Sequence, residues 1–463
     1  MKFILFSPFA KASAIGRVTA LIVKAMLDRG DSVVVVRTEH ESLLNMPAHA
    51  SDAALIPWTD DGAVRAAVDD ADALVYQIGN NYSYHRGGLH WLPLLPGIVC
   101  LHDFLVAHLF AEWAHDRREE AERVLAGWYG ADAATAFFKA DTSKAFIDMA
   151  SQLYPMTEWI ASMALCVVSH SHWGMPRVAQ ACAGPLRVVP LPYDAPFCTS
   201  DAPGTSDENR KDGLVNVLTV GHVNPNKRID SVIRAIGSSA HLRQAVSYRL
   251  CGLIEPRVAV ELTSLARAQG VNLEISGETD DRVLQSAMNE ADVVCCLRWP
   301  SFESASATTI EALLYGKAVV VTNAAFYSEI PGDIVRKISP DDEVAELRAT
   351  LEELLSNPES RLSMAERGRT WAEQTFNADR YVEELASLAT AAAAAQPALD
   401  MAATLIEYLQ GWYASLEIMT SAHLSNPLAI FEDLTKSAAT ERPLSSEPRT
   451  TARGDTVQQK HTT

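Results

Sequence analysis

Two glutamates, Glu303 and Glu311, lie in one stretch of the chain with seven residues between them. If Glu303 ends a loop and Glu311 lies about one turn into the helix that follows, both carboxylates can reach one bound molecule. Each can then accept hydrogen bonds from hydroxyl groups, one group on a sugar and the other on a ribose. The spacing is equally consistent with a solvated loop carboxylate and a glutamate that stabilises a helix N-terminus.

The residues around this pair predict one βαβ unit. Residues 293–297 form an apolar run typical of a buried strand, and residues 318–321 form the next one. Ser304 and Ser306 suit the start of the helix between them, and the backbone N–H groups from Ser304 through Ala305 to Ser306 suit a phosphate. The loop should therefore lie at the carboxyl end of a parallel strand, where open α/β sheets bind ligands.

This segment resembles the E-x7-E signature of family 4 of the retaining glycosyltransferases, whose two-domain architecture is called GT-B. The resemblance implies that Glu303 contacts the transferred sugar and that Glu311 contacts the ribose of a nucleoside diphosphate. It also implies that the new bond keeps the anomeric configuration of the donor. Many members have glycine where this chain has Ser306. The similarity extends over roughly residues 1–388.

A second loop that could bind a ligand follows the apolar run that ends before Gly221. Lys227 lies just before a predicted helix, where its ammonium group and the helix N-terminus can both meet a diphosphate. The family usually has an arginine directly after this glycine, whereas this chain has His222. Either Arg228 compensates or the phosphate site depends on Lys227 alone. The alternative is an ordinary solvated lysine at a helix start.

Three further positions enter the site by resemblance. His102 follows the predicted strand 97–101 and matches the histidine that approaches the donor sugar, although a histidine at a strand end is often structural. Gly16 matches the hinge of a flexible cleft loop, or it simply begins a helix. Gly277 lies in a turn that presents backbone groups to the nucleotide base, or in an ordinary capped turn.

The acceptor side is expected in the N-terminal half. Asn80, Asn81 and Tyr82 follow the predicted strand 73–78, and Asp103 follows the next one, so all four face the cleft. Polar loops with aromatic residues also occur without a ligand. Residues 104–164 predict several helices rich in aromatic side chains, most of them in the core and some lining the acceptor pocket.

The length of 463 residues exceeds one ordinary core and predicts two domains. We expect an α/β fold of two Rossmann-like βαβ domains facing a cleft. Residues 1–195 form the acceptor-side domain and residues 196–375 the nucleotide-sugar-binding domain. By resemblance, a helix at about 376–395 crosses back to the N-terminal domain. Residues 396–435 predict a helical extension and residues 436–463 a disordered tail.

Composition excludes several classes of protein. The chain has 39 lysines and arginines against 58 acidic residues, a net charge of −19, which disfavours binding to nucleic acid or to an anionic membrane surface. Seven cysteines without a CxxC pair disfavour a disulfide framework and a zinc site. Asp69, Asp70 and Asp72 superficially match a metal-binding D-x-D motif but are expected to be a solvated helix cap, so no metal is predicted.

The expected location is the cytoplasm. The first residues mimic a signal peptide, but their apolar run is short and broken by Pro8, and the following segment continues into a βαβ pattern. No stretch reaches the roughly 18 to 20 apolar residues of a membrane span.

The expected activity is that of a hexosyltransferase. It moves a sugar from a UDP- or GDP-sugar, its co-substrate, to a hydroxyl of a sugar, a lipid-linked glycan or a small molecule, with no cofactor required. One alternative is a nucleotide-sugar-binding protein without turnover, which the departures at His222 and Ser306 favour. A Rossmann dehydrogenase is less favoured, because the loop after the first strand lacks G-x-G-x-x-G.

Overall fold

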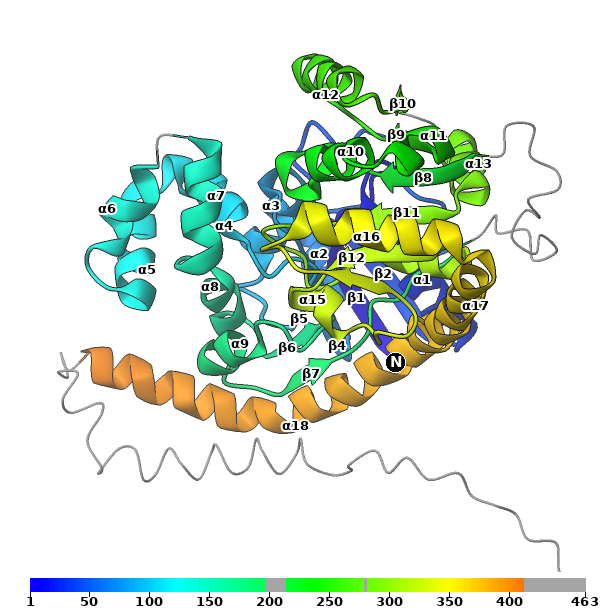
Figure 1. Cartoon of the computed structure of the whole chain (residues 1–463). Helices are drawn as coiled ribbons and strands as arrows, with labels where there is room; N and C mark the ends of the chain where they lie inside the picture. The colour runs from blue at the N-terminus through cyan, green and yellow to red at the C-terminus, as the bar shows by residue number, and fades with distance from the viewer. Residues whose placement is uncertain (141, 196–213, 279–280, 412–463) are drawn as a thin grey trace, which may run out of the picture.

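Two parallel α/β domains make up the computed structural model, which describes residues 1–140, 142–195, 214–278 and 281–411. Each domain is one sheet with helices on both faces, and the two domains lie against each other (Figure 1). The predicted fold class of two Rossmann-like domains is confirmed.

The N-terminal sheet has seven parallel strands in the order β3-β2-β1-β4-β5-β6-β7. Its central strands are apolar runs buried on both faces, as in β1, where residues 3–6 are fully buried, whereas the edge strands are more exposed. The carboxyl ends of β1, β4 and β5 adjoin one another, so their loops meet. The strands are β1 (Lys2–Ser7), β2 (Ser32–Arg37), β3 (Ala54–Pro57), β4 (Ala73–Ile78), β5 (Ile98–Leu101), β6 (Cys166–Ser169) and β7 (Leu186–Val188).

Helices connect these strands, and an additional group of helices is inserted between β5 and β6. The connecting helices are α1 (Ala14–Asp28), α2 (Asp61–Val68), α3 (Tyr82–Trp91) and α9 (Met175–Ala181). The inserted helices are α4 (Ala107–Trp113), the 3-10 helix η1 (Ala114–Asp116), α5 (Arg118–Tyr129), α6 (Ala133–Phe138), α7 (Ser143–Gln152) and α8 (Thr157–Ser162). Figure 1 shows the inserted helices as a separate lobe beside the sheets, coloured cyan to green.

The C-terminal sheet has six parallel strands in the order β10-β9-β8-β11-β12-β13. The strands are β8 (Val215–Val220), β9 (Val246–Cys251), β10 (Leu273–Gly277), β11 (Val293–Cys296), β12 (Ala318–Thr322) and β13 (Arg336–Ile338). The helices are η3 (Pro225–Lys227), α10 (Ile229–Gly237), α11 (Ala240–Ala245), α12 (Pro256–Gln269), α13 (Asp281–Glu290), α14 (Ala307–Leu314), α15 (Ala325–Glu329), α16 (Glu343–Ser356) and α17 (Pro358–Thr375). The β11-α14-β12 unit is the predicted βαβ unit around the glutamate pair.

The last described helix, α18 (Ala378–Gly411), returns to the N-terminal domain and packs on α1 (Figure 1). It is one helix of 34 residues, so the prediction of separate elements on either side of position 395 is wrong. Pro397 does not end it because Pro397 and Ala393 are both exposed, so water can satisfy the Ala393 carbonyl. The rest of the expected extension and the expected tail at 436–463 lie outside the described residues.

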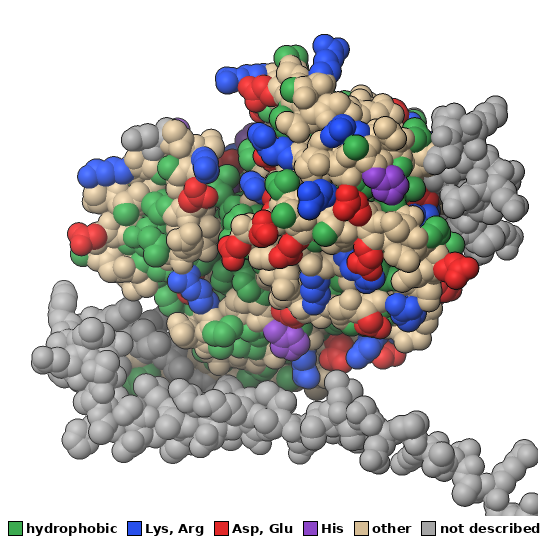
Figure 2. All heavy atoms as spheres, viewed as in Figure 1, with side chains coloured by type: hydrophobic (Ala, Val, Ile, Leu, Met, Phe, Trp, Pro, Cys, Tyr) green, Lys and Arg blue, Asp and Glu red, His purple; other side chains and the backbone are tan. Residues whose placement is uncertain are grey.

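Charged side chains are mixed on the face of the molecule seen in Figure 2. Lysine and arginine alternate there with aspartate and glutamate over the C-terminal domain, without a patch of one sign. Within the described ranges, no helix is long and apolar enough to cross a membrane.

Candidate active site

A cavity of about 560 Å³ lies between the two domains, at the carboxyl ends of their strands. Its N-terminal wall includes residues 12–15 and the loops after β4 and β5, and its C-terminal wall includes the loops after β8 and β11. Of the predicted site residues, those that line it are Asn80, Asn81, His102, Asp103, Glu303 and Ala305, together with His222. The topology therefore brings residues about two hundred positions apart to one cavity.

Backbone hydrogen bonds join the two walls. The Phe104 N–H donates to the Phe302 carbonyl at 2.7 Å, and the Ser304 N–H donates to the His102 carbonyl at 2.9 Å. Asp103 and Glu303 form an antiparallel bridge between these contacts. The expectation that the Ser304 N–H is free for a phosphate is wrong, because it holds the domains together instead.

The Glu303 carboxylate is held by two buried side chains. Glu303 Oε1 lies 3.0 Å from Arg298 Nε and accepts a hydrogen bond from the Tyr327 hydroxyl at 2.6 Å. Burial opposes the charge of Arg298, but Tyr327 and Glu303 outweigh it and raise the pKa of Arg298. Sequence reasoning did not place Arg298 in the site, although its position directly after the apolar strand in the Glu303 loop was a usable signal.

Lys227 is buried behind Gly221 and donates to the Val220 carbonyl. Burial, with the nearby Arg298, lowers the pKa of Lys227 to about 7. Gly221 has φ +92°, a conformation that favours glycine, and a Cβ there would lie 2.7 Å from Lys227 Nζ. Lys227, Arg298 and Glu303 therefore form one cluster of charges.

Arg228 does not join this cluster. Its Nε lies 2.8 Å from Oε1 of Glu343, at the start of α16, and its backbone has φ +55°. The suggestion that Arg228 compensates for His222 is not supported by this geometry. Arg298 supplies the second cation beside Lys227 instead.

The other glutamate, Glu311, is buried and faces the N-terminal domain. Its Oε1 lies 3.5 Å from Arg17 Nη1 in α1, and Arg17 also pairs with Asp194 at 2.9 Å. Ser306 caps α14 by accepting a hydrogen bond from the Thr309 N–H at 3.4 Å, as its sequence position predicts. Arg17 was missed, because its contact with Glu311 joins residues that are remote in the sequence.

His102 is buried and neutral. Its Nε2–H donates to Gln77 Oε1 at 2.6 Å, and burial, with His170 and His85 nearby, holds its pKa well below the ordinary value. The neighbouring Asp103 accepts from the Asn80 N–H at 2.8 Å, and burial raises the pKa of Asp103 to about 7. His102 is therefore a hydrogen-bonding group rather than a cation.

Tyr82 and Gly277 lie apart from the cavity. Asn81 caps α3 and Tyr82 begins it, so Tyr82 turns to the other side of the helix and lines a second cavity. Gly277 ends β10 with φ +68° and does not line the cavity; its carbonyl accepts from the Gly252 N–H at 2.8 Å. The acceptor-side expectation for Tyr82 therefore does not hold for this cavity.

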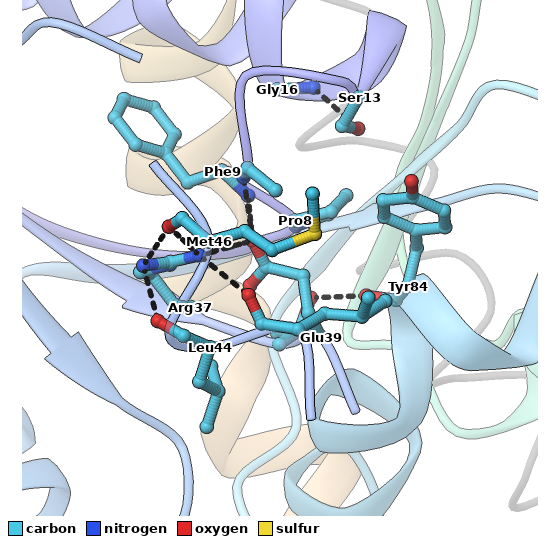
Figure 3. A network of polar contacts seen from close by, with 12 residues as sticks. Pro8, Phe9, Ser13, Gly16, Arg37, Glu39, Leu44, Met46 and Tyr84 are labelled. Atoms are coloured by element: carbon cyan, nitrogen blue, oxygen red, sulfur yellow. Dashed lines mark hydrogen bonds and ion pairs between the residues drawn. The ribbon is translucent and has the colours of Figure 1, made fainter. Parts of the chain in front are cut away.

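Gly16 lies in the first turn of α1, not in a flexible loop. Ser13 Oγ accepts from the Gly16 N–H at 3.0 Å, and a Cβ on Gly16 would lie 3.0 Å from the Pro8 carbonyl oxygen (Figure 3). This close packing explains the glycine, and the helix-start alternative is the one that the structure supports.

A buried carboxylate fastens the loop before α1. Glu39 Oε1 accepts from the N–H groups of Phe9 at 2.8 Å and Ala10 at 2.6 Å, and it lies 3.1 Å from Arg37 Nη2 (Figure 3). Arg37 Nη1 in turn donates to the Leu44 carbonyl at 2.8 Å. This network fixes the loop that continues into the cavity wall at residues 12–15.

Replacing the buried Glu39 by Gln is expected to lower the free energy of unfolding by about 2 to 4 kcal/mol, because it leaves the partly buried Arg37 without its counter-ion. Urea denaturation measures this loss. Glu41→Gln is the control: the Glu41 side chain is 45% exposed and pairs with Arg86 at 3.3 Å, so its loss should stay below about 0.5 kcal/mol. Equal losses in the two variants would contradict the proposed anchoring.

The described residues hold no group of three or more His, Cys, Asp or Glu side chains arranged for a metal ion. Of the three aspartates of the superficial D-x-D match, Asp70 pairs with the Lys2 ammonium group and Asp72 accepts from the Lys2 N–H at 2.7 Å. They anchor the start of β1.

Part of this sequence matches a known protein family. Residues 205–371 match the family described as glycosyl transferases group 1. A search of curated proteins finds no match to this sequence.

Solved structures share the fold over most of the chain. Sucrose-phosphate synthase from Thermosynechococcus elongatus is 14% identical with a TM-score of 0.58, covering 84% of this chain and 98% of its own. HepE from Anabaena, solved with UDP and glucose, is 17% identical with a TM-score of 0.54, covering 84% and 99%. WaaG, a glycosyltransferase involved in lipopolysaccharide biosynthesis, is 16% identical with a TM-score of 0.56, covering 83% and 99%. The two-domain fold is thus that of GT-B glycosyltransferases.

Proposed function

We propose that this chain, whose residues 205–371 match the glycosyl transferases group 1 family, moves a hexose from a UDP-sugar to an acceptor hydroxyl. UDP is favoured over GDP because the similar HepE structure was solved with UDP and glucose. The acceptor is a sugar, a lipid-linked glycan or a small molecule held mainly by the N-terminal domain.

The observation that carries the proposal is the charge cluster in which Glu303 lines the cavity and the buried Lys227 and Arg298 lie behind it. Two cations beside one carboxylate suit a diphosphate and its sugar: Lys227 and Arg298 neutralise the leaving phosphate, and Glu303 contacts the sugar. The N-terminus of α14 adds backbone N–H groups. Such preorganised charges stabilise the transition state for departure of the diphosphate.

In the proposed reaction the bond between the anomeric carbon and the phosphate oxygen breaks as the acceptor oxygen bonds to the same face of that carbon. The acceptor proton passes to the leaving phosphate oxygen. His102, neutral and buried, lies in the same cavity as Glu303 and holds the sugar by hydrogen bonds. Asn80, Asn81 and Asp103 orient the acceptor. The scheme uses no cofactor and no metal.

Thermal unfolding with a panel of nucleotide sugars tests the donor, since a ligand at about 100 times its Kd adds roughly 2.7 kcal/mol to stability. We expect UDP-hexoses to raise Tm more than GDP-hexoses, and UDP to be released when an acceptor is added. Binding without UDP release would favour the alternative of a non-catalytic binding protein. Absence of a shift with every nucleotide sugar would contradict the proposal.

Glu311→Gln is expected to weaken the binding of UDP and of the UDP-sugar by the same factor, about tenfold, because a ribose contact is common to both. Isothermal titration calorimetry with each ligand measures it. Asp194→Asn is the matched control, since it removes the other carboxylate partner of Arg17 and keeps Glu311. A similar loss in the control would assign the effect to Arg17 instead of the ribose.

The proposal places the enzyme in the cytoplasm. Six cysteines in the described part of the chain are buried and unpaired, which is usual in a reducing compartment.

A further inference from the structure

A second cavity, of about 330 Å³, opens on the opposite side of α3 from the active-site cavity. Asn81 and Tyr84 of α3 line the active-site cavity, whereas Tyr82 and Arg86 line the second one. The far wall comes from the inserted helices α4, α5 and α8. The two cavities are therefore separated by about the width of one helix, roughly 10 to 12 Å.

Aromatic rings form much of the lining and are fixed by their neighbours. Trp58 Nε1 donates to the Glu39 carbonyl at 2.8 Å, and a Cβ on Gly87 would lie 2.3 Å from Trp58 Cγ, so the glycine makes room for the ring. On the far wall, Trp113 packs on the buried Trp159 with ring centroids 4.8 Å apart. These rings offer preformed flat surfaces.

Both arginines of this cavity are paired, and Glu120 is a further charged group in the lining. Arg86 Nη1 lies 3.3 Å from Glu41, and Arg117 Nη1 lies 2.7 Å from Asp116. Each guanidinium has five N–H groups, so hydrogen-bond donors remain after pairing. A neutral ligand with many hydroxyl groups fits this combination better than an anion does, and the arginines make the lining too polar for a lipid chain.

We propose that this second cavity is a distal acceptor subsite that binds the far end of an oligosaccharide whose near end lies in the active site. Sugar C–H faces stack on Trp58 and Trp113, and hydroxyl groups bind Arg86, Arg117 and the Tyr82 hydroxyl. The inference rests on the proposed function, and it gives the acceptor a class: a carbohydrate long enough to cross the start of α3. It also gives Tyr82 an acceptor role outside the first cavity.

Binding is tested first without a donor. The full chain is titrated with maltotetraose, cellotetraose and chitotetraose while its tryptophan fluorescence is followed. We expect a saturable change with at least one tetrasaccharide, and about a tenfold higher Kd for that sugar in Trp113→Leu and in Arg117→Ala. Trp128→Leu and Arg118→Ala are matched controls, because both residues lie on α5 outside this cavity and should keep the wild-type Kd.

Two results would overturn the subsite: no saturable change with any of the three sugars, or the same Kd in the cavity variants and in the controls. Arg117→Ala keeps the test valid if Trp113→Leu does not fold, because the Arg117 side chain is 36% exposed. UDP release is measured separately. Tetrasaccharide binding that depends on Arg117, without any turnover, would reject the proposed function and leave the subsite standing. Turnover without tetrasaccharide binding would reject the subsite and leave the proposed function standing.

Discussion

Replacement of Glu303 by Gln is expected to lower the rate of sugar transfer by about a hundredfold, which corresponds to roughly 2.7 kcal/mol of transition-state stabilisation. The carboxylate faces the cavity while Arg298 and Tyr327 hold it, so it is placed to stabilise positive charge on the sugar ring. The binding of free UDP should change little, because Glu303 contacts only the sugar in the proposed arrangement. Single-turnover transfer and UDP titration measure the two effects.

Tyr327→Phe gives a graded comparison. It keeps the charge of Glu303 and removes only the hydroxyl that donates to Oε1 at 2.6 Å, so the rate should fall less than in Glu303→Gln. The two glutamates have been assigned to the wrong ends of the donor if two results occur together. Glu303→Gln would lose as much UDP affinity as Glu311→Gln, and its turnover of bound donor would be unchanged.

Lys227→Met should weaken UDP binding by about tenfold to a hundredfold and leave the binding of free uridine unchanged. The expected contact is a charge-assisted hydrogen bond to phosphate, worth roughly 1.5 to 3 kcal/mol. Calorimetry with the two ligands measures the difference. Lys337→Met is the control, since Lys337 donates to the Ser328 carbonyl away from the cavity. Equal losses for UDP and uridine would contradict a phosphate contact.

The same lysine predicts a pH dependence of UDP binding. In the empty site the pKa of Lys227 is lowered to about 7, chiefly by burial, and a bound diphosphate raises it. Above pH 7 the empty protein has lost this proton and must take one up on binding, so UDP affinity should fall as pH rises from 7 to 9. The phosphate itself titrates near 6, below this window. Calorimetry in buffers of different ionisation enthalpy should show proton uptake in the wild type and none in Lys227→Met.

The central strands could be predicted from the sequence because parallel strands buried on both faces are continuous apolar runs. Residues 293–297 and 73–78 are of this kind, and the loops after them carry Glu303 and Asn80, which line the cavity. The glutamate pair was found for the same reason. Local pattern therefore predicts the fold class and the loops that carry the site residues.

Contacts between segments that are distant in sequence could not be predicted from local patterns. Arg17 meets Glu311, and Glu39 meets Phe9, only because the fold brings segments that are remote in sequence together. The start of α3 was read as a polar loop after a strand, and Gly87 and Gly88 disfavour a helix by roughly 1 kcal/mol each relative to alanine. Packing overrides this preference: without a Cβ, Gly87 lets the helix lie directly on Trp58. The second cavity depends on that contact.

The backbone hydrogen bonds between Phe104 and Phe302 and between Ser304 and His102 have a kinetic consequence. They tie the loop that carries His102 to the loop that carries Glu303, so any hinge motion that separates the domains must first break them. Their amide protons are shielded while the cleft is shut and exchange with solvent when it opens. The exchange rates at Phe104 and Ser304 therefore measure how often the two domains separate.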